Sequence, residues 1–433
     1  MSGANAAPDR PGRRGVLAPL AIRDFRCLWT GMALSLLGDG VLVVALAWQA
    51  YDLSNRPSAM SLVGVCLTVP QVALILVGGV VSDRFERRRV MLVADVVRGG
   101  ALGLLAVLSV SGTLTLWQLA AVAAAYGAAS GFFIPAFDAL VPDLVPEDRL
   151  EEANALEQFV RPTALWLVGP ALGGALIGVA GVGWAFAFDA LTFVVSVAFL
   201  LRISPSPAEP GTPLTVRAAA RELGEGFAFI RRHTWLWATF VAATLTYLLF
   251  LGPTEVLLPY LVKNDLHGDA HDLGIILSGG GLGALAAALL IARAGLPRRV
   301  MTFTYTVWAL ATLSVAGYGV AQNRWEAMAA AALISGLEAV GAVAWTTTKQ
   351  RSVPAELMGR VSAFDWFISI ALVPVSYAVT APVAGAVGTR QTLVGAGILG
   401  ALVTLAFLFV PGVRDPEQPG PVSVPEHVAA NAC

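Results

Sequence analysis

The feature that most limits how this chain can fold is a series of apolar runs, each long enough to cross a lipid bilayer. A helix needs about 20 mostly apolar residues to span the hydrocarbon layer, because its backbone N–H and C=O groups must be paired within the segment. We predict transmembrane helices at 27–50, 60–81, 91–111, 115–140, 156–180, 183–202, 235–262, 272–294, 300–320, 326–347, 364–386 and 390–410. The expected fold is therefore an all-α membrane protein with twelve transmembrane helices.

The composition agrees with a lipid environment and excludes several function classes. Hydrophobic residues make up 57% of the 433 positions and charged residues 13%, too few for a water-exposed surface. A net charge of −1 gives no field that would attract nucleic acid. The chain contains no nucleotide-binding Gly-x-x-x-x-Gly-Lys-Ser/Thr loop, no Ser/His/Asp constellation and no metal-type cysteine spacing. We expect a protein that is not an enzyme, with no metal and no cofactor.

The basic residues indicate the orientation of the chain. Of its 28 lysines and arginines, Arg56, Lys263, Arg324 and Arg390 fall in the loops on one side, and Arg98 and Arg161 fall inside helices. The remaining 22 fall on the other side. The positive-inside rule then predicts a multi-pass protein of the cell (inner or plasma) membrane with both termini in the cytoplasm.

A long internal connection divides the helices into six and six. We expect a cytoplasmic arm at 1–26, a six-helix bundle at 27–202, a cytoplasmic linker with an amphipathic helix at 203–233, a second bundle at 234–410 and a disordered tail at 411–433. The tail is rich in proline and cannot bury enough apolar surface to order itself.

An internal repeat supports this division. Arg88-Arg89-Val90-Met91 recurs 210 residues later as Arg298-Arg299-Val300-Met301, and Val145-Pro146 recurs 208 residues later as Val353-Pro354. Chance similarity of loops is the alternative explanation. Two parallel six-helix repeats are a common transporter design, with the substrate site between them near the centre of the membrane.

Several ionisable groups fall inside the predicted helices, where a charge costs about 2.5 to 3.5 kcal/mol on insertion scales. Asp39, between Gly38 and Gly40, is the clearest case, and it either couples protons, binds substrate or makes a structural hydrogen bond. Asp95 with Arg98, and Glu157 with Arg161, are spaced to neutralise each other. The candidate residues for a substrate and proton cavity are Asp39, Tyr126, Arg161, Asp189, Glu255 and Glu338.

The loop after the second predicted helix reads Gly78-Gly79-Val80-Val81-Ser82-Asp83-Arg84-Phe85-Glu86-Arg87-Arg88-Arg89. It resembles motif A of the major facilitator superfamily, Gly-x-x-x-Asp-Arg-x-Gly-Arg-Arg, with Glu86 in place of a glycine. The matching residues are Gly79, Asp83, Arg84, Arg87 and Arg88. The resemblance implies alternating access, with this loop and an acidic residue at the inner end of the fourth helix, Asp138, stabilising the outward-facing state. The alternative is a topogenic positive cluster without a gating role.

Further segments resemble the branch of that superfamily that contains enterobactin and macrolide exporters. They are Arg23-Asp24-Phe25-Arg26, Leu37-Gly38-Asp39-Gly40, Asn154-Ala155-Leu156 and Phe188-Asp189-Ala190-Leu191. Gly169, Pro170, Gly173 and Gly174 resemble motif C of drug/proton antiporters, which favours export, although a purely structural kink would use the same residues. Leu165 replaces the first glycine of that motif, and the antiporter arginine on the fourth helix has no counterpart between 120 and 130.

These observations together predict a proton-driven exporter of a small amphipathic molecule, such as an antibiotic, a siderophore or another secondary metabolite. One proton moving inward through 100 mV gains about 2.3 kcal/mol, which can drive export without ATP. The expected partners are the small-molecule substrate, protons and the lipid bilayer, with no nucleic acid, and the expected functional unit is a monomer. The alternatives are an importer or facilitator and a membrane sensor or scaffold that transports nothing.

Overall fold

The computed structural model describes residues 17–146, 149–204 and 216–417. Most of the expected N-terminal arm, the start of the linker and the tail beyond 417 lie outside these ranges. The side chains of residues 76, 83, 151, 216–223, 355 and 356 are also outside the description.

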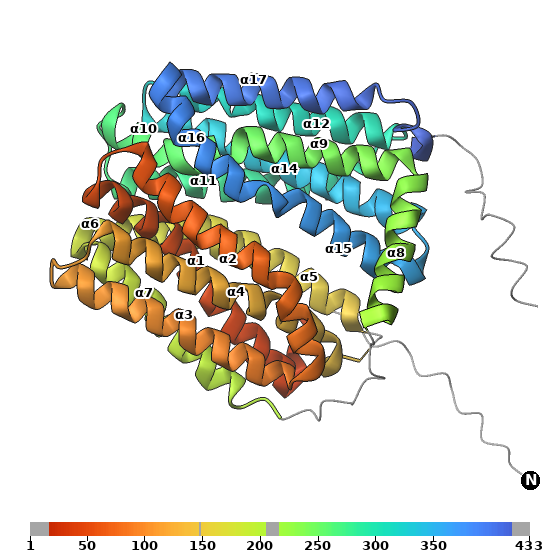
Figure 1. Ribbon diagram of the computed structural model, residues 1–433, viewed down its shortest axis with the longest axis horizontal. Helices are drawn as coiled ribbons and strands as arrows, with labels where there is room; N and C mark the ends of the chain where they lie inside the picture. Colours follow the sequence, from red (N-terminus) through yellow and green to blue (C-terminus); the bar gives the residue numbers. More distant parts are fainter. Residues whose placement is uncertain (1–16, 147–148, 205–215, 418–433) are drawn as a thin grey trace, which may run out of the picture.

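The described residues form helices throughout (Figure 1). The first group is α1 (Arg23–Leu53), α2 (Pro57–Arg84), α3 (Arg87–Val110), α4 (Leu116–Leu144), α5 (Leu150–Arg161), α6 (Gly169–Ala180) and α7 (Val182–Leu200). The helix α8 (Val216–Arg232) follows as a connection. The second group is α9 (Thr234–Gly252), α10 (Leu258–Asn264), α11 (Ala270–Ala294), α12 (Val300–Ser314), α13 (Ala316–Val320), α14 (Arg324–Ser352), α15 (Ala355–Ala371), α16 (Val373–Val387) and α17 (Thr389–Leu408).

The predicted number of membrane spans is confirmed. Among the described residues, 12 helical stretches are long and apolar enough to cross a membrane, and each overlaps one predicted span. Four spans are built from two consecutive helices, namely α5 with α6, α9 with α10, α12 with α13, and α15 with α16.

Two of these breaks are π-helical turns that begin at a proline. One covers Pro162–Val168 between α5 and α6, and the other covers Pro253–Leu257 between α9 and α10. Proline has no backbone N–H to donate, so the regular hydrogen-bond ladder of the helix is interrupted there. Single π-turns inside helices are frequent at functional sites. The second turn carries Glu255, one of the candidate cavity residues.

The helices of the first and second groups lie as two bundles in Figure 1. We call the end with the loops around 54–56 and 265–269 the outer end, and the end with the loops around 85–86 and 353–354 the inner end, following the distribution of basic residues. In the described part of the chain, the hydrogen bonds between the bundles lie at the outer end or at the centre. They are Tyr51 to Val256, Asn55 to Asn264, Lys263 to Asp52 and Ser278 to Leu167. The hydrogen bonds between the bundles thus lie at the centre and toward the end that we call outer.

The connection contains a helix, as expected, and the start of the tail is more ordered than its composition suggests. The helix α8 packs on α15, where Arg360 pairs with Glu225 at 2.9 Å. After α17, Val413 is fully buried, and the Glu417 carboxylate accepts a hydrogen bond from the Thr302 backbone N–H at 2.5 Å. The segment 411–417, expected to be disordered, is thus packed against α12.

Candidate functional site

The centre of the first bundle holds the most sharply predicted site residue. Asp39 lies in α1 between two glycines, is partly exposed, and accepts a hydrogen bond from the Tyr126 hydroxyl on α4. Tyr126 is itself buried, and its ring packs edge-on against Phe193 of α7. Two residues that are 87 positions apart in the sequence are thus brought together near the middle of α1 and α4.

A buried ion pair lies beside this contact. Arg98 of α3 is 4% exposed and pairs with Asp95, which is fully buried. The other Asp95 oxygen accepts a hydrogen bond of 2.7 Å from Ser196 of α7. The pair predicted from the spacing of the two residues is therefore present, and it also ties α3 to α7.

The Arg98 guanidinium is enclosed by aromatic rings. Its central carbon lies 4.0 Å from the ring centroid of Phe133 and 4.6 Å from that of Phe193. Such contacts are worth about 2 kcal/mol or more when the cation is desolvated. The rings hold the cation between α3, α4 and α7, close enough to act electrostatically on Asp39.

Asp189 of α7 lies next to the backbone of α1 at Gly38, the residue that precedes Asp39. It is fully buried and faces Gly38, where an added Cβ would collide with the Asp189 carboxyl group and the Thr192 hydroxyl. Gly38 therefore allows the close approach of α1 and α7 at this point. Asp39, Tyr126 and Asp189, three of the predicted cavity residues, thus lie in one cluster.

The other predicted cavity residues lie elsewhere. Glu255 and Glu338 are in the second bundle, where they are partly exposed and close enough to act electrostatically on each other. Arg161 ends α5 and pairs with Glu157 at 2.8 Å, with 47% of its side chain exposed, and it is close enough to act electrostatically on Asp39. The structure thus separates the acidic groups into one set in each bundle.

The loop that resembles motif A joins the inner ends of α2 and α3. Arg87 pairs with Asp143 of α4 at 2.5 Å and donates to the Ala139 carbonyl at 2.9 Å. Arg88 donates to the Leu200 carbonyl at the end of α7, also at 2.9 Å. These bonds anchor the loop within the first bundle.

In this conformation the loop pairs with an acidic residue other than Asp138, whose expected role in the outward-facing state stays a prediction. In this conformation Arg87 pairs with Asp143, whereas Asp138 is exposed and has Glu157 and Arg161 as its charged neighbours. Arg84 is exposed, and Asp83 belongs to α2 but its side chain lies outside the description. An added Cβ on Gly79 would meet nothing within 4 Å, so in this conformation the glycine is not required by close packing.

The residues that resemble motif C bring α6 against α1. A Cβ on Gly169 would lie 2.6 Å from the Gly40 Cα, and one on Gly173 would lie 3.0 Å from the Val41 Cα. Pro170 is buried in the first turn of α6. Small residues at such crossings let helix backbones pack closely in membranes.

The last glycine of the same group faces the other bundle. A Cβ on Gly174 would lie 2.7 Å from the Ala270 carbonyl oxygen and 3.2 Å from the Gly274 Cα, both on α11. This glycine is therefore part of the outer contact between the bundles.

The outer contact includes residues that the sequence reasoning missed. Lys263 pairs with Asp52, Asn55 and Asn264 exchange amide hydrogen bonds, and the Tyr51 hydroxyl donates to the Val256 carbonyl at 2.5 Å. Each partner lies in a different bundle. Lys263 was counted only as an exception to the charge rule, and its spacing of 211 residues from Asp52 gave no local signal.

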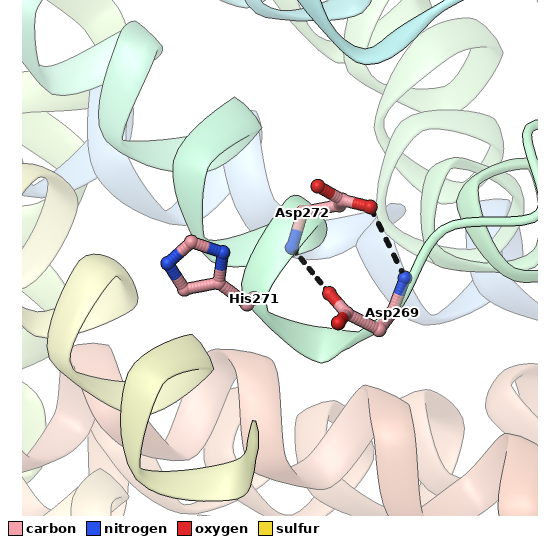
Figure 2. Close-up of side chains that lie close together, drawn as sticks. All are labelled: Asp269, His271 and Asp272. Atoms are coloured by element: carbon pink, nitrogen blue, oxygen red, sulfur yellow. Dashed lines mark hydrogen bonds between the residues drawn. The ribbon is translucent and has the colours of Figure 1, made fainter. Parts of the chain in front are cut away.

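One group of side chains near this end has the residue types of a metal site. Figure 2 shows Asp269, His271 and Asp272 at the start of α11, with their ligand atoms within 4.8 Å of one another. Asp269 and Asp272 each accept a backbone hydrogen bond from the other as a capping box. Asp272 also pairs with Arg324 at 2.6 Å. The two carboxylates are thus engaged in starting α11 and holding it to α14.

Comparison with known proteins agrees with this architecture. A family model described as transmembrane secretion effector matches residues 14–419. The chain belongs to the transmembrane secretion effector family. The resemblance read from the sequence, to the macrolide-exporter branch of the major facilitator superfamily, is thereby confirmed.

Relatives of this transmembrane secretion effector include proteins named for efflux. It is 23% identical over 379 residues to macrolide efflux protein A of Streptococcus pyogenes, covering 87% of this chain and 93% of the relative. It is 29% identical over 303 residues to the multidrug efflux pump Tap of Mycobacterium tuberculosis, covering 66% and 68%. The protein is a membrane transporter by family.

Solved structures show the same fold. The nucleoside transporter NupG matches with a TM-score of 0.67 at 13% identity, covering 89% of this chain and 98% of the other. A POT family transporter crystallised with 5-aminolevulinic acid matches with a TM-score of 0.69 at 13% identity, covering 92% and 96%. The predicted major facilitator fold of this secretion effector is confirmed.

Proposed function

We propose that this protein is a proton-driven exporter of a small amphipathic molecule that works by alternating access. The observation that carries the proposal is the position of Asp39. It is a partly exposed carboxyl group near the middle of the predicted membrane span α1, it accepts a hydrogen bond from Tyr126, and it is close to a buried arginine. Ionisable groups at this depth are rare outside ion and substrate pathways.

The contacts between the bundles support an inward-facing resting conformation. The outer end is closed by Lys263 with Asp52, Asn55 with Asn264 and the glycine crossing of α6 with α11. Substrate would enter from the cytoplasmic side between the bundles. Release to the outside requires these outer contacts to break and the inner ends of the helices to meet, with the loop at 85–86 acting in the inner gate.

The relatives support export of an amphipathic compound. The names macrolide efflux protein A and multidrug efflux pump belong to proteins that share most of the length of this chain. Antibiotics, siderophores and other secondary metabolites are the compounds we expect as substrates. The carboxyl groups of Glu255 and Glu338 would favour a molecule with a basic group, since among the described residues neither pairs with a basic side chain.

Proton coupling supplies enough energy for this task. A membrane potential of 100 mV contributes about 2.3 kcal/mol per proton. A pH difference of one unit contributes about 1.4 kcal/mol more, and the sum corresponds to a concentration ratio of about 500-fold. Exchange of one proton for one substrate that crosses uncharged gains this whole sum. For a substrate that carries one positive charge, one-for-one exchange moves no net charge and is driven by the pH difference alone, so a second proton would be needed to use the potential.

The test uses everted membrane vesicles, in which an exporter accumulates substrate inside. Radiolabelled erythromycin and the dye ethidium serve as probes, and a proton gradient is generated by respiration. We expect accumulation of a probe that an uncoupler abolishes and that Asp39→Asn reduces at least tenfold. Asp265→Asn, the same chemical change at an outer ion pair with Arg390, is the matched control and should transport normally.

The alternatives predict different results. An importer or facilitator would not accumulate either probe against its gradient in everted vesicles. A sensor or scaffold would move neither probe, and Asp39→Asn would change nothing in the assay. Accumulation that persists in the presence of the uncoupler would contradict proton coupling while leaving export intact.

A further inference from the structure

The first bundle contains a buried carboxyl group that has no ion-pair partner among the described residues. Asp189 is fully buried, and the Thr192 hydroxyl lies 2.7 Å from its backbone carbonyl oxygen and 3.1 Å from its Oδ1, so one hydroxyl hydrogen is shared between them. The other carboxyl oxygen, Oδ2, is buried without a hydrogen-bond partner among the described residues. A buried polar group in a folded protein normally has a partner, so this exception needs an explanation.

The charges around Asp189 come from three helices. Asp39 faces it from α1, Asp95 and Arg98 lie on α3, and the Tyr126 hydroxyl lies on α4. The sequence of α6, the other neighbour of α7 in this bundle, contains no ionisable residue. Three carboxyl groups therefore share one buried cation.

That cation is already engaged. The Arg98 guanidinium forms its ion pair with Asp95 and is otherwise surrounded by the rings of Phe133 and Phe193. An ionised Asp189 would be a buried charge without a paired partner, which costs several kcal/mol. A neutral Asp189 with one unpaired O–H would cost less, because no charge is then left without a partner. The neutral form is therefore the one that fits this conformation.

We propose that Asp189 is an occluded proton-binding site, which holds a proton in the inward-facing state and exchanges it with Asp39 during the transport cycle. The proposal rests on the proton coupling described above and adds the residue that stores the proton. In the exchange, the O–H bond of one carboxyl group breaks as that of the other forms, so that charge and atoms balance. Asp39 can exchange its proton with the cavity between the bundles. The buried Asp189 holds a proton out of contact with that cavity.

The packing around Gly38 explains how the two carboxyl groups can be neighbours. Gly38 directly precedes Asp39 in α1, and the Asp189 carboxyl group fills the space where a side chain on residue 38 would stand. Any movement of α1 along α7 would change this contact. A shift of α1 between the two conformations would thus alter the distance between Asp39 and Asp189 and make the proton exchange depend on the conformation.

Infrared difference spectroscopy of the purified full-length protein, labelled with carboxyl-¹³C aspartate, tests the site without any substrate. At neutral pH we expect the C=O stretch of a protonated aspartic acid, shifted by the label and resistant to exchange in D₂O. Asp189→Asn should remove this band, whereas Asp39→Asn and the control Asp265→Asn should keep it. A band that survives in Asp189→Asn, or its absence from the wild type, would overturn the proposal.

Thr192→Val provides a second variant that preserves the carboxyl group. Valine has nearly the shape of threonine but cannot donate the hydrogen bond to Asp189 Oδ1. We expect the C=O band to remain but to move in frequency. A band at the wild-type frequency would mean that the protonated group is a different aspartate.

Transport assays link the site to coupling. Asp189→Asn should reduce proton-driven accumulation of the probe at least tenfold, but exchange of labelled for unlabelled probe should stay within twofold of wild type because it needs no net proton movement. Loss of both activities would indicate structural damage and count against the proposal. Retention of proton-driven accumulation would overturn it and leave the proposed function standing.

The two proposals can fail separately. If the infrared band belongs to Asp189 but wild-type transport ignores the uncoupler, proton coupling is wrong and the protonated site remains. If transport depends on the proton gradient but the band does not belong to Asp189, the coupling stands and the site is wrong.

Discussion

The two bundles have similar helices but different interiors. The repeat offset of 210 residues relates Asp95 and Arg98 of α3 to Tyr305 and Trp308 of α12. In the first bundle these positions form a buried ion pair, and in the second they hold a tyrosine and a tryptophan. At the offset of 208 residues, Asp189 corresponds to Gly397.

The second interior is an aromatic cluster. Trp345 of α14 lies edge-on to Trp235 and Phe240, with ring centroids 5.7 and 6.1 Å away, and Trp308 lies 6.3 Å from it. The Tyr305 hydroxyl is 2.8 Å from the Thr239 hydroxyl. Such packing depends on shape and dispersion. Trp345 also donates a hydrogen bond of 2.9 Å to Asp365, which pairs with Lys349, so one ion pair borders this aromatic cluster.

The comparison indicates that the two bundles have different roles, with proton exchange in the first and structural packing in the second. In the first bundle, Asp39, Asp95 and Asp189 are gathered around Arg98 at the interface of α1, α3, α4 and α7, whereas the aromatic cluster of the second bundle is bordered by the ion pair of Lys349 on α14 with Asp365 on α15. At the corresponding positions, the second bundle packs rings that give a rigid frame, and its candidate carboxyl groups, Glu255 and Glu338, lie apart from this cluster. We therefore expect substitutions of equivalent residues in the two halves to have unequal effects.

The largest expected effect is that of Arg98→Met, which removes the only cation of the buried cluster. Removing one partner of a buried ion pair typically costs about 3 to 5 kcal/mol. We expect a clearly lower thermal unfolding midpoint in detergent and loss of proton-driven transport. Asp95→Asn combined with Arg98→Met should recover part of the stability, because no buried charge of the pair then remains unpaired.

Trp308→Phe, at the equivalent position of the second bundle, is the matched comparison for Arg98→Met. It should lower the unfolding midpoint far less and leave the coupling to protons unchanged. Equal losses in the two variants would contradict the division between a charged half and an aromatic frame.

Gly38→Ala should have the next largest effect, because the new methyl group would meet the Asp189 carboxyl group and the Thr192 hydroxyl. Overpacking of this kind costs about 1 to 3 kcal/mol. Transport rate and unfolding midpoint should both fall. Gly103→Ala in α3, where nothing lies within 4 Å, is the control and should be neutral or slightly stabilising.

Two tyrosines allow a direct comparison of the halves. Tyr126→Phe removes a hydrogen bond to a carboxyl group, worth about 1.5 to 3 kcal/mol if that group is charged, whereas Tyr305→Phe removes a neutral one worth about 1 kcal/mol. We expect Tyr126→Phe to slow proton-driven transport at least tenfold and Tyr305→Phe to stay within twofold of wild type. A transport defect of similar size in both would mean that the two interiors are equally involved in coupling.

The smallest effect on stability is expected for Lys263→Gln at the outer contact. Its side chain is 22% exposed, and exposed ion pairs contribute about 0 to 1 kcal/mol. Because the pair joins the bundles, its loss should still favour the outward-facing state, measured as a longer distance between spin labels at the outer ends. Arg324→Gln breaks an ion pair within the second bundle and should leave that distance unchanged.

Much of the fold could be predicted from hydropathy, because lipid requires each span to be long, apolar and helical. The local pair Asp95 with Arg98 was also visible, since residues three apart share a helix face. Residue spacing does not show which acidic residue of α4 pairs with Arg87. Asp138 and Asp143 are five residues apart on α4, which places them about 140° apart around the helix, so only contact with α3 decides which one meets the arginine.

The sequence by itself determined the twelve apolar spans, the two-fold repeat and the family motifs, because these depend on local composition and spacing. Only the tertiary structure placed Asp189 against Gly38, enclosed Arg98 in aromatic rings and paired Lys263 with Asp52. Those contacts join residues on different helices, and the rotation and register of packed helices decide them. The lipid solvent fixes which segments cross the membrane, but close packing between helices decides which charges meet.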